Sequence, residues 1–144
     1  FGLSVHNAIA GQWSILRGQR GESVAIAGEA DTFEHAMVEA AALLQAGATN
    51  VLAVIAEERP PAAYQSWIDD VPFSYALALK VGKIQAGDSA QTGQHWRLRL
   101  EPAGEGSAAS EWPHALDVVR ALHGHGHTLT HTWKMRRWIW QRVM

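Results

Sequence analysis

Residues Ser23–Ala56, SVAIAGEADTFEHAMVEAAALLQAGATNVLAVIA, decide the fold class of this 144-residue chain. Two short apolar runs, Ser23–Ala27 and Asn50–Ala56, enclose a longer segment with helical periodicity. Short apolar runs are typical of buried strands, and a helical apolar period is typical of a helix packed on a sheet. The stretch therefore predicts a strand, a helix and a second strand, joined as a right-handed parallel crossover unit. The apolar face of the predicted helix consists of Phe33, Met37, Ala40 and Leu44.

The ends of this predicted helix carry their own signals. Asp31 and Glu34 have the spacing of a capping box, in which Asp31 accepts hydrogen bonds from the first-turn amides and Glu34 reaches back to the helix start. This arrangement turns Glu34 away from the apolar face. Gly47 follows the last apolar position and is a natural helix stop.

Further elements are predicted on both sides of this unit. Upstream, the apolar positions of residues 5–16 have helical spacing; Ser4 can cap that helix and Gly18 ends it. Downstream, the pattern predicts strands and one short helix, in the order Phe73–Lys80, His95–Leu100, a helix from Pro113 to Leu122, His127–Thr132 and Trp133–Val143. Together these elements predict an α/β protein with a mixed sheet and packed helices.

Composition excludes several classes of protein. Hydrophobic residues make up 47% of the chain, charged residues make up 18%, and the formal net charge is −2, so the chain is neither disordered nor basic enough to bind nucleic acid over its whole surface. No apolar run is long enough to span a membrane. The absence of cysteine excludes disulfides, thiolate metal sites and a thiol nucleophile. We expect no cofactor, no nucleic-acid partner and no membrane span.

Several short motifs follow one another in residues 4–57. They are Asn7–Gly11 (NAIAG), Ser14-Ile15, Gly18–Gly21 (GQRG), the run Ser23–Ala27, and Ala46-Gly47 before Val51–Ile55. In this order and spacing, the chain resembles the N-terminal half of ketosynthases, the condensing enzymes with a thiolase fold. Leu3–Ala8, Gly28-Glu29 and the short C-terminal part resemble most the ketosynthase N-terminal-domain proteins of bacterial aryl polyene clusters, which are similar to chain-length factors.

The resemblance implies a function without catalysis. It aligns Ala30 with the family's nucleophilic cysteine, and a methyl group has no nucleophilic chemistry. The family's catalytic histidines come from a C-terminal half that this chain is too short to hold after Lys80. The implied protein is a non-catalytic subunit that pairs with an active ketosynthase and shapes the acyl tunnel while chains grow on acyl carrier protein. No signal-peptide pattern opens the chain, so we expect it in the cytoplasm.

The same resemblance implies an organisation and a set of candidate residues. Residues 1–82 would form a thiolase-like fragment, and residues 83–144 an abbreviated part packed on the same domain. Because the chain opens at Phe1, we expect a missing N-terminal segment or another chain to cover an open side of the sheet. The acyl-tunnel candidates are His6, Asn7, Trp13 and Phe33, although Trp13 and Phe33 are better explained as core residues. The dimer-interface strand would comprise Ser23, Val24, Ala25, Ile26 and Ala27, because an apolar edge strand needs a partner.

A small hydrolase or thioesterase is the alternative function. Ser4 and His6 could act as nucleophile and base, although no third orienting group is evident. Glu29 and Asp31 could act as acid and base if burial raised the pKa of one of them. The helix dipole lowers both pKa values, which argues against this alternative.

A histidine-rich metal-binding module is a further alternative. His123, His125 and His127 alternate with glycines, and three imidazoles on one side of a strand could bind zinc, with His131 as a fourth ligand. The simpler interpretation is a helix that ends at Gly124, with His123 near the negative end of its dipole and no metal bound. We favour the simpler interpretation.

The last part of the chain is basic and aromatic. From Arg120 onward there are five Lys and Arg residues and no acid, interleaved with tryptophans. The tryptophans could complete the core while the arginine stems cover it. A second possibility is docking of the acidic carrier protein, for which the candidates are Arg136, Arg137 and Arg142. Single-stranded nucleic acid, which stacks on aromatic side chains, is the least favoured partner.

Overall fold

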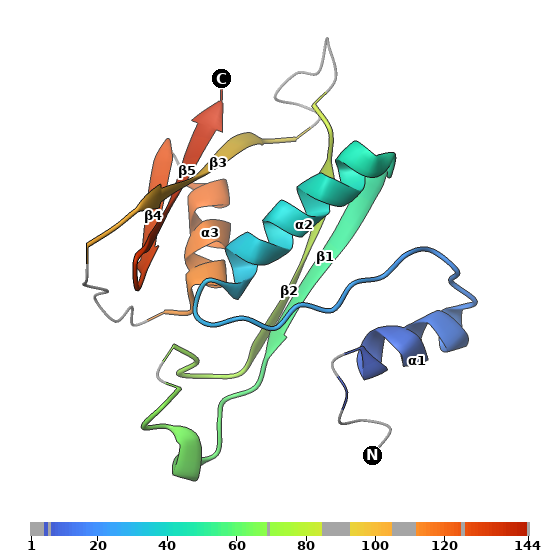
Figure 1. Cartoon of the computed structure of the whole chain (residues 1–144), viewed down its shortest axis with the longest axis horizontal. Helices are drawn as coiled ribbons and strands as arrows, with labels where there is room; N and C mark the ends of the chain where they lie inside the picture. Colours follow the sequence, from blue (N-terminus) through green and yellow to red (C-terminus); the bar gives the residue numbers. More distant parts are fainter. Residues whose placement is uncertain are drawn as a thin grey trace.

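The computed structural model describes residues 5, 7–68, 70–84, 93–104, 112–124 and 126–143 (Figure 1). The elements, in chain order, are α1 (Ala8–Arg17), α2 (Thr32–Ala46), β1 (Asn50–Glu57), the 3-10 turn η1 (Ala62–Tyr64), β2 (Tyr75–Gly82), β3 (His95–Pro102), α3 (His114–His123), β4 (Thr128–Trp133) and β5 (Arg136–Val143). The predicted α/β class is confirmed, and most predicted elements form within a few residues of their expected bounds. No described helix is long and apolar enough to cross a membrane.

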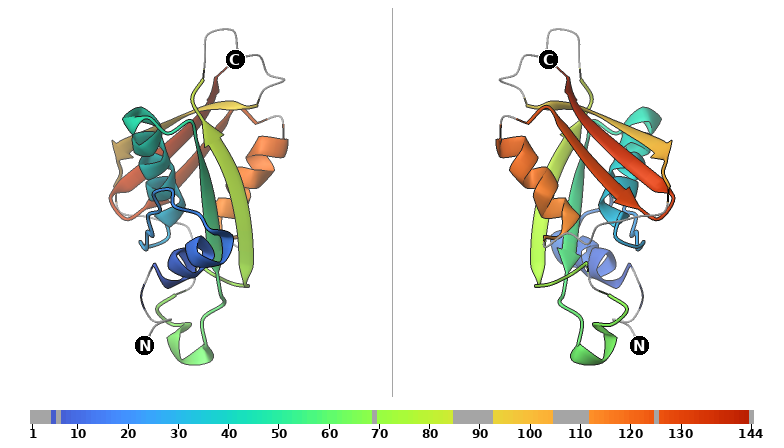
Figure 2. Two further views of the ribbon diagram at one scale, coloured as in Figure 1. Left: turned by 90° about the vertical axis from the view of Figure 1, so that its right-hand side faces the viewer. Right: turned by 90° about the vertical axis from the view of Figure 1, so that its left-hand side faces the viewer.

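The strands form two separate antiparallel sheets. β1 pairs with β2 along its whole length, and the second sheet has the order β3-β5-β4. Figure 2 shows the strands of the two sheets running at an angle to each other. β4 and β5 follow each other directly in the chain, whereas α3 and β4 lie between β3 and its partner β5.

The predicted parallel crossover unit is wrong for this chain. Residues 23–27 run as an extended segment and not as a strand, because no neighbouring strand bonds to them in the described part of the chain. β1 pairs antiparallel with β2 along one edge, and no described strand pairs with its other edge. The segment keeps the extended shape that the apolar pattern predicts, but its backbone hydrogen-bonding groups are left without a ladder.

The core lies where α2, α3 and the two sheets meet. α2 packs on β1, and α3 packs on β4; Figure 1 shows α2 crossing the β1–β2 pair. Burial of these apolar side chains is the main favourable contribution to folding. The predicted burial of Phe33, Ala40 and Leu44 on α2 is confirmed. The buried core cluster contains Phe33, Ile55, Ala115, Val118 and Trp140.

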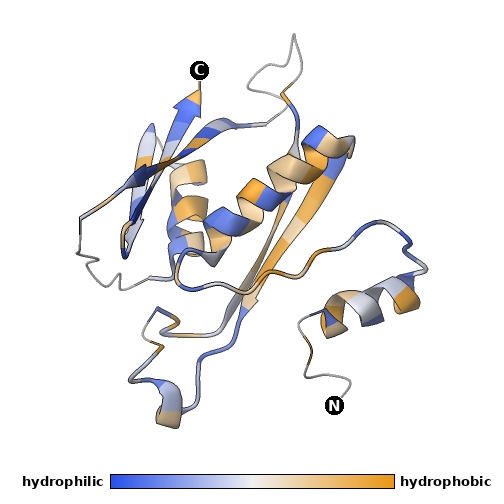
Figure 3. Cartoon of the chain, viewed as in Figure 1, coloured by the Kyte–Doolittle hydropathy of each residue, from blue (hydrophilic) through white to orange (hydrophobic). Residues whose placement is uncertain are grey.

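Two apolar surfaces remain exposed. On α1, which stands apart from the sheets in Figure 1, the side chain of Ile15 is 81% exposed and that of Trp13 is 56% exposed. The predicted core position of Trp13 is therefore wrong in this structure, because nothing described packs over that helix face. On β1, Leu52 and Val54 are each 63% exposed, and Figure 3 shows apolar residues along this strand. The β1–β2 sheet thus has an exposed apolar side.

Candidate functional site

The turn before α2 is the centre of the candidate site. The Thr32 hydroxyl accepts a hydrogen bond from the Gly28 amide at 3.0 Å and donates one to the Glu29 carbonyl at 2.7 Å. These bonds fold residues 28–31 into a tight turn at the helix start. Ala30 lies in this turn, two residues before Thr32, the first residue of α2. Ala30 therefore lies between an extended segment and the start of α2.

Asp31 is fully buried beside this turn and is bound by donors from β5. Its carboxylate accepts hydrogen bonds from Arg136 Nε at 2.6 Å and Nη2 at 3.0 Å, and from the Trp138 indole at 2.9 Å. His35 Nε2 lies 3.4 Å from the same carboxylate. Burial raises the pKa of Asp31, but the bonds from Arg136 and Trp138 outweigh this effect and hold the pKa below its ordinary value.

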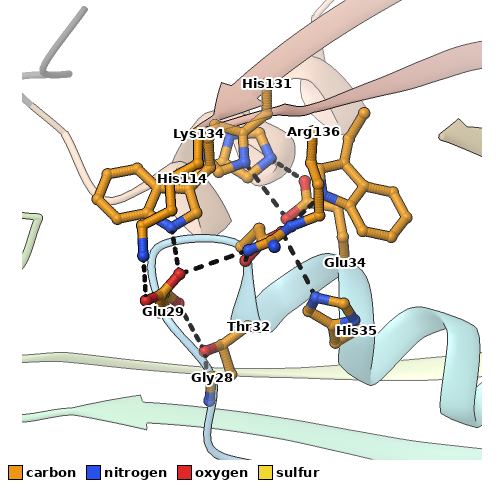
Figure 4. Close-up of polar contacts among 12 residues, drawn as sticks. Gly28, Glu29, Thr32, Glu34, His35, His114, His131, Lys134 and Arg136 are labelled. Atoms are coloured by element: carbon orange, nitrogen blue, oxygen red, sulfur yellow. Dashed lines mark hydrogen bonds and ion pairs between the residues drawn. The ribbon is translucent and has the colours of Figure 1, made fainter. Parts of the chain in front are cut away.

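Glu29 binds donors from the turn between β4 and β5. It accepts hydrogen bonds from Lys134 Nζ and from the Trp133 indole, the latter at 2.8 Å, and lies 3.5 Å from Arg136 Nη2 (Figure 4). The hydrogen bonds from Lys134 and Trp133 lower the pKa of this carboxyl. Ion pairs with Lys134 and Arg136 therefore fix the start of α2 to the β4–β5 hairpin.

Glu34, one helical turn further on, is also fully buried. Its carboxylate contacts His114 Nε2, lies 3.4 Å from His131 Nδ1 and accepts a hydrogen bond from the Trp140 indole at 3.0 Å. Burial raises the pKa of Glu34, but the three donors, His114 above all, lower it to about 2. The imidazole rings of His114 and His131 stack with their centroids 3.7 Å apart.

The predicted capping box is therefore wrong. Asp31 occupies the N-cap position, but its side chain makes no capping hydrogen bond. Glu34 points into the protein and not back along the helix. Both carboxylates are instead bound by arginine, tryptophan and histidine side chains from segments 80–107 residues away. We call Glu29, Asp31 and Glu34 the carboxylate cluster.

The carboxylate cluster does not favour acid–base catalysis. A carboxyl group that donates a proton near neutral pH needs a raised pKa. The pKa values of Glu29 and Asp31 are lowered, so both groups are ionised. Neither Glu29 nor Asp31 can therefore be the general acid that the hydrolase alternative requires. Its other pair, Ser4 and His6, lies outside the described residues.

The described tunnel candidates, Asn7, Trp13 and Phe33, do not all come together. His6 is outside the described residues, and Asn7 and Trp13 are exposed at α1. Phe33 is buried in the core, where its ring lies 5.5 Å from that of Trp140. The extended segment Ala25–Gly28 does line a shallow pocket with Thr32 and the end of β1 at Ala56-Glu57.

The predicted docking arginines have different environments. Arg136 is bound to the carboxylate cluster, and Arg142 pairs in register with Trp96 on the face of the sheet that turns toward the core. Only Arg137 is exposed on the outer face, where the register also places Arg97 and Arg99. We missed Arg97 and Arg99 in the sequence, although their alternation in His95–Leu100 indicated an exposed face.

The predicted histidine triad is not assembled in the described residues. His123 and His127 are exposed, and His125 lies outside the described residues. His131, the predicted fourth ligand, instead faces Glu34 and His114. Glu34, His114 and His131 are the group whose ligand atoms lie within 4.8 Å of one another. Neither Glu34 nor His114 was a predicted ligand.

The comparisons with known proteins agree with this fold. The family model "Beta-ketoacyl synthase, N-terminal domain" matches residues 1–141, so the chain belongs to that family. A search of curated proteins finds no match. The fold is similar to that of a chain in the solved structure of the ketosynthase ApeO in complex with its chain length factor ApeC, from Xenorhabdus doucetiae, with a TM-score of 0.79 and 24% sequence identity. The match covers 99% of this chain and 56% of that chain. The expected ketosynthase-like family and partial thiolase-like fold are therefore confirmed.

Proposed function

We propose that the chain is a non-catalytic subunit, similar to a chain-length factor, which pairs with an active ketosynthase in the cytoplasm. It would shape the tunnel for an acyl chain that grows on acyl carrier protein. The observation that carries this proposal is the turn at the start of α2. Ala30 lies there, and Glu29 and Asp31 beside it are bound by Lys134 and Arg136. These ion pairs hold the turn to the β4–β5 hairpin, but Ala30 at its centre has no reactive group.

The open surfaces support pairing with another subunit. The backbone of Ser23–Ala27 makes no hydrogen bond to another described residue, so it can add a strand to a partner's sheet. Val24 and Ile26 in this segment are also exposed. Contiguous apolar surface of this kind marks sites of protein association.

The tunnel would form at this interface. Asn7 and Trp13 are exposed on α1 and available to a partner. Phe33 is buried in the core, so it would support the wall of the tunnel from behind and would not contact the acyl chain directly. His6 remains a candidate because of the resemblance alone.

Carrier-protein docking would use the outer face of the β3-β5-β4 sheet. Arg97, Arg99 and Arg137 lie on this face, with Glu101 as the acid among them. All the tryptophans of this sheet lie on its inner face, which turns toward the core. The outer face therefore has no tryptophan on which bases could stack. Its positive charge therefore fits an acidic protein better than a nucleic acid.

Co-expression with a ketosynthase encoded beside this protein is the direct test. We expect the two proteins to co-purify as a heterodimer, and condensation of acyl and malonyl thioesters to require the ketosynthase's cysteine. Val24→Asp/Ile26→Asp should abolish co-purification, whereas Val38→Asp, at an exposed position of α2, should not. Condensation by this protein alone would contradict the proposal, and so would failure to pair with any ketosynthase.

A further inference from the structure

Glu34 differs from the other two carboxylates of the cluster in the charges around it. Glu29 and Asp31 both contact Arg136, and Glu29 also contacts Lys134. Among the described residues, no arginine or lysine contacts Glu34. A buried carboxylate is costly without a compensating positive charge. A metal ion bound to the two imidazoles would supply such a charge.

The residues around Glu34 are those of a zinc site. Histidine nitrogens and a carboxylate oxygen bind zinc at about 2.0–2.2 Å, and a His₂Glu set leaves a fourth position for water. Glu34 comes from α2, His114 from α3 and His131 from β4. Their ligand atoms lie within 4.8 Å of one another. Trp140 donates to Glu34 Oε1 at 3.0 Å, which fixes the orientation of the carboxylate.

For zinc to bind, one of the two stacked rings, His114 or His131, has to change its orientation. Two imidazoles inclined by only 19° cannot both direct a nitrogen lone pair at one ion. His114 is in close contact with Glu34 and is the more buried ring. His131 has the longer contact, 3.4 Å, and its side chain is 14% exposed. We therefore expect His131 to be the ring that rotates when the ion binds; Figure 4 shows both rings beside Glu34.

We propose that Glu34, His114 and His131 bind one Zn²⁺ ion, which cross-links α2, α3 and β4. The site is independent of the proposed pairing with a ketosynthase. It is also distinct from the exposed loop histidines, because the described loop residues His123 and His127 do not belong to this group.

Zinc titration of the metal-free protein tests the site. We expect one zinc per chain by isothermal titration and a zinc-dependent rise in the melting temperature. His131→Gln should weaken binding by roughly tenfold or more, and Trp140→Phe by about tenfold. His35→Gln is the matched control, because His35 neighbours Glu34 in sequence but contacts Asp31. The triple variant H123Q/H125Q/H127Q should retain the zinc.

If His131→Gln does not fold, the NMR signals of the imidazole rings in the unmodified protein can test the zinc site instead. Zinc should shift the ring signals of His114 and His131 and leave those of His123 and His127 in place. The proposal is overturned if the protein binds no zinc, if the shifts fall on the loop histidines, or if the triple variant loses the ion.

Discussion

The indole of Trp138 donates a hydrogen bond to Asp31 at 2.9 Å, across 107 residues of sequence. Both side chains are buried. This bond joins the start of α2 to the middle of β5 and is part of the network that holds the turn around Ala30. Its contribution can be measured separately from that of the neighbouring ion pair.

Trp138→Phe should destabilise the protein by about 1–3 kcal/mol, because it removes a donor from a buried carboxylate while keeping most of the ring. Urea denaturation measures the free energy of unfolding. Trp67→Phe is the control, since Trp67 is largely exposed on the loop after η1, and should change the stability by less than about 0.5 kcal/mol. Equal effects of the two substitutions would contradict a specific role for the Trp138 bond.

Arg136→Ala should have a larger effect, about 3–5 kcal/mol, because it leaves the buried Asp31 carboxylate without its cation. Arg136→Lys should recover only part of this loss, since lysine cannot reproduce the two guanidinium bonds. The adjacent Arg137 is exposed, so Arg137→Ala should be nearly neutral in the same urea experiment. A neutral Arg136→Ala would show that the network does not stabilise the fold.

Stability should fall in acid because of Asp31. Its pKa in the folded protein lies below the ordinary value of 3.8, so its ionised form stabilises the fold above that pH. This contribution is lost as the pH falls through the lowered pKa. The difference in unfolding free energy between the wild type and Asp31→Asn should therefore be largest above pH 5 and shrink toward pH 3. A difference independent of pH would contradict this assignment.

Ala30→Cys should not create a reactive thiol. The carboxylates of Glu29 and Asp31 flank the position in sequence, and the part of their negative charge that Lys134 and Arg136 do not neutralise disfavours the thiolate. The helix N-terminus acts in the opposite direction. We expect the carboxylates to prevail, so that the rate of alkylation by iodoacetamide keeps rising up to pH 8.5 and no condensation appears. A rate that is already constant at pH 7 would show that the helix dipole prevails.

The sequence predicted the elements better than the contacts between them. α2 and β1 form as expected because their apolar periods are local properties of the chain. Glu34 was expected to face away from the core, since capping-box spacing is common at helix starts. Its actual partners come from α3, β4 and β5, and no local pattern contains them. A sequence signal was available only for Glu29 and Asp31, because the acid-free basic end of the chain, with Lys134 and Arg136, complements these two acids.

The strand predicted at Ser23–Ala27 failed for another physical reason. Apolar pattern predicts where a strand can form, but a strand also needs a neighbour to complete its hydrogen bonds. In this chain no described strand lies in hydrogen-bonding register with the segment, although β1 pairs with β2 along only one of its edges.

Because the carboxylate cluster is bound to the β4–β5 hairpin, the N-terminal and C-terminal parts of the chain depend on each other for folding. Cleavage near residue 82 would separate the two parts that the sequence suggests. The carboxylates of Glu29 and Asp31 would then be in the first fragment, and their partners Lys134 and Arg136 in the second. Neither piece could then bury its charged groups at low cost. Expressed apart, the halves should be poorly folded and should regain structure on mixing, as complementing fragments of one cooperative unit.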